Sequence, residues 1–90
     1  METMTSGKNQ SKLPKWFKGE LYPKGDTVKN PFSGEICELN AEELSMYDFI
    51  VGAQAIFGMG HIESEVVRDF ERALHWFRKN NAKAYMILLD

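Results

Sequence analysis

The sequence predicts a mainly α-helical domain of the α+β class, in which a short N-terminal β-hairpin packs on a two-to-three-helix antiparallel arrangement. Three observations lead to this prediction. Residues 41–59 form a long apolar segment with helix start and stop signals. Residues 62–79 repeat apolar side chains at helical spacing. In residues 27–39, apolar and polar side chains alternate on both sides of a turn. A length of 90 residues, 43% hydrophobic content and a net charge of −2 suit one small globular domain.

The helix at residues 41–59 has unusually clear boundaries. Asn40 is a favoured N-cap residue, because its side-chain oxygen can accept from the free backbone N–H groups of the first turn. Glu43 stands three residues later, where its carboxylate can accept from the Asn40 backbone N–H and complete a capping box. Gly58 and Gly60 follow the last apolar residues, as is common at helix C-termini. The pattern therefore predicts a single helix.

This helix is also more apolar than an ordinary surface helix. No charged residue occurs from Phe49 to Gly60, and the apolar positions extend around most of the helix, so we expect it to be covered on several sides. A membrane span needs about twenty apolar residues, which this stretch does not reach. The cover is either the chain's own core or a second chain that approaches at the small residues. The candidate partner-contact residues are Gly52, Ala55, Ile56, Trp76 and Leu89.

A β-hairpin is predicted at about residues 27–39. Residues 30–34, Asn-Pro-Phe-Ser-Gly, have turn chemistry, because proline presets its backbone angle and glycine tolerates positive φ. The flanking residues alternate, which places Val28, Ile36 and Leu39 on the inner side and Cys37 on the polar side. A two-stranded ribbon is not stable alone, so it must pack on the helices.

Two further helical pieces follow. The segment at about residues 62–79 has an apolar stripe and charges at its ends that match the helix dipole, and Asn80-Asn81 ends or bends it. A last helical piece at about residues 82–89 is rich in apolar side chains, so the C-terminus must dock on protein. The apolar stripe of the longer helix consists of Ile62, Val66, Phe70, Ala73, Leu74 and Phe77.

The N-terminal part differs in charge from the rest. Residues 1–15 are polar and predict a disordered basic arm, and residues 16–90 predict the single domain. Up to Asn30 there are six lysines against three acids, whereas five basic residues stand against ten acids from Pro31 onward. The arm either docks on the acidic body or binds nucleic acid through lysine–phosphate contacts and aromatic stacking. The residues that would carry nucleic-acid binding are Lys12, Lys15, Trp16 and Lys18.

The sequence contains few groups for chemistry. A single cysteine, Cys37, cannot form an internal disulfide, which favours a reducing compartment such as the cytoplasm. His61 and His75 are the only imidazoles, and neither they nor Cys37 lie in a recognisable catalytic motif. A structural zinc site would need more cysteine and histidine ligands than the chain has. We therefore predict no catalytic, metal or cofactor site and no enzymatic activity.

Three runs of the sequence carry a resemblance. They are residues 30–35 (Asn-Pro-Phe-Ser-Gly-Glu), residues 44–54 (Leu-Ser-Met-Tyr-Asp-Phe-Ile-Val-Gly-Ala-Gln), and residues 76–90, which begin Trp-Phe-Arg-Lys-Asn-Asn-Ala-Lys and end Leu-Leu-Asp. The chain from about residue 16 to residue 90 resembles a group of small, uncharacterised proteins of contractile-tailed phages of marine bacteria, including cyanophages. The resemblance implies a phage accessory protein made in the bacterial cytoplasm. It implies no activity, ligand or catalytic residue.

Together, these observations predict a small non-enzymatic interaction protein. It would act by helix-mediated self-association or by binding a host or phage protein, without a membrane and without a cofactor. The alternative is a nucleic-acid-binding accessory protein that uses the lysine-bearing arm. Retention of DNA or RNA that falls steeply with salt would favour the alternative.

Overall fold

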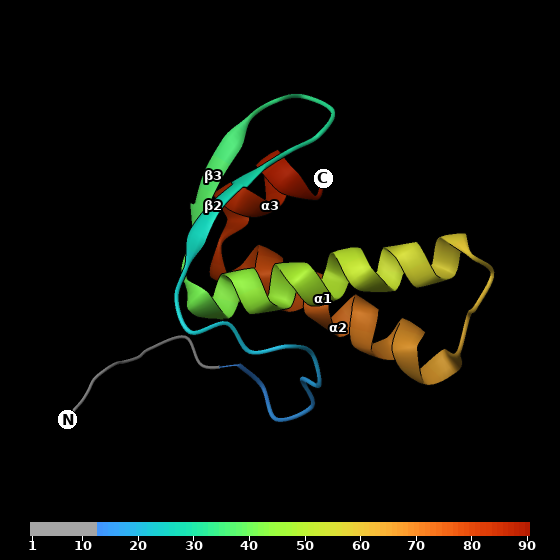
Figure 1. Cartoon of the computed structure of the whole chain (residues 1–90). Helices are drawn as coiled ribbons and strands as arrows, with labels where there is room; N and C mark the ends of the chain where they lie inside the picture. The colour runs from blue at the N-terminus through green and yellow to red at the C-terminus, as the bar shows by residue number, and fades with distance from the viewer. Residues whose placement is uncertain (1–12) are drawn as a thin grey trace.

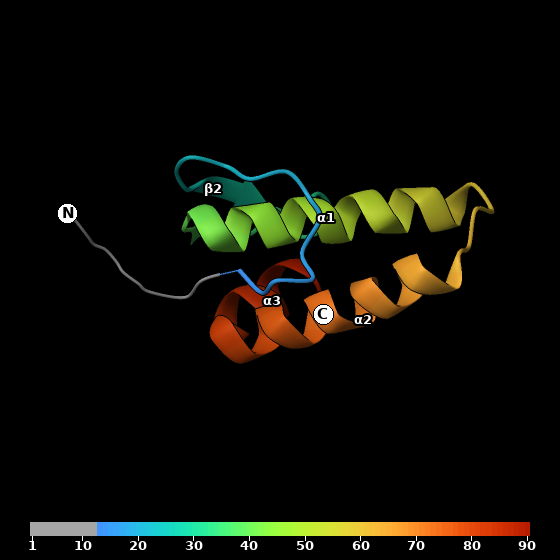
Figure 2. The same ribbon diagram turned by 90° about the horizontal axis from the view of Figure 1, so that it is seen from below.

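The computed structural model describes residues 13–90, which form a two-stranded antiparallel hairpin followed by three helices (Figure 1). The elements are β2 (Asp26–Lys29), β3 (Ile36–Leu39), α1 (Ala41–Gly58), α2 (Ser64–Asn80) and α3 (Ala82–Leu88). α1 and α2 lie side by side in opposite directions, and the hairpin and α3 pack at the end where α1 begins (Figures 1 and 2). The predicted α+β fold class is confirmed. Most of the predicted disordered arm lies outside the described residues.

The start of α1 is held by the predicted capping box. The Asn40 side-chain oxygen accepts a hydrogen bond of 2.7 Å from the Glu43 N–H. The Glu43 carboxylate in turn accepts one of 3.0 Å from the Asn40 N–H. Because these bonds satisfy two backbone donors at the helix start, they define where β3 ends and α1 begins.

This cap gives a first testable prediction. Asn40→Ala should lower the free energy of unfolding by about 1 kcal/mol, because a backbone N–H loses its acceptor. Urea denaturation followed by circular dichroism measures the change. Asn80→Ala is the matched control, since the exposed Asn80 side chain only donates to the Trp76 carbonyl. An equal loss in both variants would contradict the assigned role of the cap.

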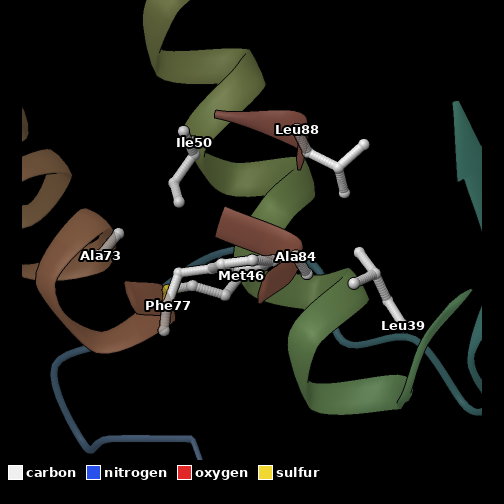
Figure 3. Close-up of a cluster of buried hydrophobic side chains, with 7 residues drawn as sticks. All are labelled: Leu39, Met46, Ile50, Ala73, Phe77, Ala84 and Leu88. Atoms are coloured by element: carbon white, nitrogen blue, oxygen red, sulfur yellow. The ribbon is translucent and has the colours of Figure 1, made fainter. Parts of the chain in front are cut away.

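The hydrophobic core lies where α1, α2, α3 and β3 meet (Figure 3). Met46 and Ile50 of α1 and Phe77 of α2 are fully buried, and the Phe77 ring centroid lies 6.4 Å from that of Tyr47. Met46 and Ile50 are four residues apart in α1, so their side chains lie on the same side of the helix. The remaining buried members of the core cluster are Leu39, Ala73, Ala84 and Leu88.

The hairpin forms as predicted, but one side chain faces the other way. The register pairs Val28 with Cys37, and directly opposed residues point to the same face of a sheet. Leu39 is buried, so Cys37, two residues before it, also faces inward and packs against the core. Ile36 is consequently 64% exposed, and its predicted inner position is wrong. The physical reason is the strict two-residue period of a strand, which cannot place Ile36 and Leu39 on one face.

The chain before the hairpin crosses the helices. The Phe17 ring meets the Phe49 ring of α1 edge to face, with centroids 5.8 Å apart. The Tyr22 backbone N–H donates to the buried Ser45 hydroxyl of α1 at 2.9 Å. These contacts attach residues 13–25 to the outside of α1.

The C-terminal piece docks inside the domain. Asn81 ends α2, and its side-chain oxygen accepts from the Ala84 N–H at 3.1 Å, which starts α3. The predicted break at Asn80-Asn81 is therefore confirmed. The Asn30 side-chain amide donates to the Ile87 carbonyl at 2.7 Å and ties the hairpin turn to α3. Within residues 13–90, no helix combines the length and the apolar character that crossing a membrane requires.

Candidate interaction surfaces

An uncharged stripe runs along the solvent-facing side of the C-terminal half of α1. We call it the outer stripe, and it consists of Val51, Gly52, Ala55, Ile56 and Met59. These positions recur at one-, three- and four-residue steps, so they share one side of the helix. Val51 and Ile56 are each 41% exposed, and Met59, just beyond the helix, is 69% exposed. A solvent-facing helix side normally carries charged residues, and this one carries none.

The arrangement of the elements leaves the outer stripe uncovered. Among the residues that the structure describes, only α2 lies beside the C-terminal half of α1 (Figures 1 and 2). Phe57 of α1 and Phe70 of α2 fill that contact edge to face, with ring centroids 5.3 Å apart. The expectation that the helix is covered on several sides is therefore correct for its first half and wrong for its second half. Three helices and one hairpin are too few to surround both halves.

The outer stripe offers room for close approach. A Cβ atom added at Gly52 would meet no atom within 4 Å, so the backbone itself is accessible there. Ala55 is exposed one turn away. Small residues spaced in this way allow another helix to pack closely. The exposed side chains of Asp48 and His61 lie beyond the two ends of the stripe.

Tyr22 belongs to residues 13–25, which we call the crossing segment, and it lies next to Asp48. Partial removal of water raises the pKa of the Tyr22 hydroxyl above 10.0, and a hydrogen bond to Asp48 and the negative charges of Asp48 and Glu20 raise it further. The Tyr22 hydroxyl therefore lies close to the Asp48 carboxylate. This places a negative charge at the end of the outer stripe that is nearest the crossing segment.

The predicted partner-contact residues fall in three places. Gly52, Ala55 and Ile56 lie together on the outer stripe. Trp76 is half-buried on α2 and borders a different surface. Leu89 follows α3 and packs against the core cluster.

A second surface is a groove on α2 that the sequence did not reveal. Trp16 from the crossing segment and Trp76 from α2 border an open groove of about 570 Å³, which we call the tryptophan groove. Its charged lining consists of Arg68, Glu71, Arg72 and Lys79, with His75 between them. The four- and seven-residue spacing of Arg68, Arg72 and Lys79 was a signal in the sequence, but the approach of Trp16 to them was not.

The predicted nucleic-acid arm is only partly described. Lys12 lies outside the described residues, and Lys15 is exposed. Lys18 forms an exposed ion pair of 3.5 Å with Glu65 at the start of α2. The Arg72 guanidinium lies over the Trp16 ring, and its Cζ atom is 5.9 Å from the ring centroid. The arm therefore contacts α2 on the side of the tryptophan groove.

The side chains that could act as a nucleophile or a base lie far apart in the sequence, on separate parts of the fold. Cys37 is a half-buried free thiol of β3, His61 lies exposed between α1 and α2, and His75 is exposed on α2. Within residues 13–90, no three histidine, cysteine, aspartate or glutamate side chains gather as metal ligands would.

Fold and surfaces together define a small α+β domain with two open surfaces, an uncharged helix face on α1 and a basic, tryptophan-bordered groove on α2. Comparisons with protein-family models, with curated proteins and with solved structures find no match to this chain.

Proposed function

We propose that this protein is a small, non-enzymatic interaction protein whose working surface is the outer stripe of α1, and that the stripe binds a second copy of the chain. The observation that carries the proposal is an exposed helix face without a charged residue, at Val51, Ile56 and Met59. Burial of such a face is favourable by about 25 cal/mol for each Å² of apolar surface removed from water.

A second copy fits this face better than a charged partner does. In a two-fold pair of antiparallel α1 helices centred on Ala55, Val51 of one copy faces Met59 of the other, and no charge is buried. The same arrangement brings Asp48 of one copy near His61 of the other at the rim. Antiparallel helix dipoles also attract each other.

The expected association is weak. A standard interface buries about 800 Å² on each partner, and one half-helix face supplies less than this area. We therefore expect a dissociation constant in the micromolar range or weaker. Small-residue packing at Gly52 increases the contact that the face can make.

The resemblance to small proteins of contractile-tailed phages supports a setting for this function. We place the protein in the cytoplasm of an infected bacterium as a phage accessory protein, which agrees with its single unpaired cysteine. In that setting a host or phage protein is the competing occupant of the outer stripe.

Sedimentation equilibrium of the full chain from about 10 μM to about 1 mM tests the proposal. The wild-type mass should rise toward that of a dimer across this range. Ala55→Glu should remain monomeric, because it places two like charges face to face at the two-fold axis. Gln54→Glu is the matched control, since it adds the same charge on the same helix but outside the stripe.

Both variants should keep the free energy of unfolding of the monomer within about 0.5 kcal/mol of wild type, because both sites are exposed. A wild-type protein that is strictly monomeric at about 1 mM would overturn binding to a second copy. Dimerisation of Ala55→Glu with wild-type affinity would also overturn the assignment of the outer stripe.

A further inference from the structure

The tryptophan groove is independent of the outer stripe. It lies on α2 and on the crossing segment, whereas the stripe lies on α1. Trp16 and Trp76, the only two tryptophans in the chain, both border it although they are sixty residues apart in sequence. The fold therefore brings the indole rings to one open surface.

Cations accompany the two rings. Arg68, Arg72 and Lys79 line the groove, and eleven residue steps along α2 separate the first from the last, or about 16 Å at 1.5 Å per residue. Glu71 is the one acid among the described residues of the lining, so positive charge exceeds negative charge there. This is the reverse of the overall balance, which is −2 for the chain.

One of the three cations is already engaged. Arg72 lies over the Trp16 ring, and its guanidinium is 3.8 Å from the Asp69 carboxylate. These contacts of Arg72 hold Trp16 against α2 and leave its guanidinium less able to bind an anionic ligand. Arg68 and Lys79 are exposed. Within residues 13–90, these two side chains are therefore the cations of the groove that remain available to an anionic ligand.

We infer that the tryptophan groove binds single-stranded nucleic acid. Arg68 and Lys79 would contact phosphates, and bases would stack on the parts of the Trp16 and Trp76 rings that line the groove. A positively charged groove combined with aromatic side chains is how proteins bind single strands without reading their sequence. The length of about 16 Å matches four to five stacked nucleotides at about 3.4 Å each.

The surface favours a single strand over an acidic peptide or a duplex. Acidic peptides are recognised by clusters of arginines, and here Arg72 is already held by Trp16 and Asp69. A duplex would bring a second phosphate strand against the acids of α2, which include Glu65 and Glu71. A single strand avoids both difficulties.

Fluorescence titration of the full chain tests the inference. The probes are oligodeoxythymidine and oligouridine of about twelve nucleotides, a duplex of equal length and a polyglutamate peptide, at about 20 mM to about 200 mM salt. Single strands should quench the tryptophan fluorescence, because both tryptophans border the groove. Contacts of Arg68 and Lys79 to two phosphates predict a slope of log K against log salt of about −1.4.

Matched charge reversals locate the site. Arg68→Glu with Lys79→Glu should weaken single-strand binding at least about tenfold at low salt, whereas Lys24→Glu with Lys29→Glu should change it less than about threefold. Both pairs are exposed and alter the net charge equally. Ala55→Glu should bind the oligonucleotides like wild type, which separates this inference from self-association through the outer stripe.

Three outcomes would overturn the inference. They are the absence of quenching by any single strand at about 20 mM salt, an equal loss of binding in the two charge-reversed pairs, and binding of polyglutamate that is as tight as that of the single strands. Unchanged circular dichroism of the variants shows that a loss of binding is not a loss of folding.

Discussion

Phe77→Ala should lower the free energy of unfolding by about 3–5 kcal/mol. The Phe77 side chain is fully buried where α2 meets Met46 and Ile50 of α1, and Ala84 of α3 lies in the same cluster. Truncation removes a ring from the centre of the core and leaves a cavity that helices of fixed position cannot fill. A domain of this size is stabilised by about 4–12 kcal/mol in total, so the variant should be largely unfolded at modest temperature.

Urea denaturation followed by circular dichroism measures this effect, and the chain supplies a matched phenylalanine. Phe32 at the hairpin turn is 97% exposed, so Phe32→Ala should change the free energy of unfolding by less than about 0.5 kcal/mol. If Phe77→Ala does not fold, Phe77→Leu should still fold and lose about 1 kcal/mol or more. Equal stability of Phe77→Ala and Phe32→Ala would refute the described core.

Gly25→Ala should destabilise the domain by about 2–3 kcal/mol. A Cβ atom on Gly25 would lie 2.8 Å from the Cα atom of Asn40 and would also meet the Leu39 carbonyl oxygen. Ordinary contacts between carbon atoms are about 3.5–4.0 Å, so the backbone would have to move. The backbone at Asn40 cannot move cheaply, because it is held by the capping box with Glu43.

Gly52→Ala is the matched substitution, and we expect it to change the free energy of unfolding in the opposite direction. Gly52 lies inside α1, where an added Cβ atom meets nothing within 4 Å. Alanine restricts the unfolded chain and favours the helix, so the free energy of unfolding should rise by about 0.5–1 kcal/mol. Both variants are compared by urea denaturation at low protein concentration, where self-association does not contribute. A Gly25→Ala variant as stable as Gly52→Ala would contradict the close approach of residue 25 to the start of α1.

Local chemistry in the sequence was sufficient to predict most of the secondary structure. The Asn40–Glu43 pair marked the start of α1, and Asn80-Asn81 marked the break between α2 and α3, because caps depend on side chains within a few residues of each other. The turn at residues 30–34 likewise identified the hairpin. The side of each strand that faces the core was not decided in this way. Cys37 faces inward and Ile36 outward because Leu39 enters the core, which is a contact between distant elements.

The candidate surfaces were likewise predictable only in part. The sequence by itself determined that residues 49–60 carry no charge, that the domain is small, and that its lysines gather before residue 31. Only the tertiary structure decided which part of α1 stays uncovered and which residues join Trp16 on α2. The physical reason is that charge and helix periodicity are properties of neighbouring residues, whereas exposure depends on how many elements are available to pack on each side.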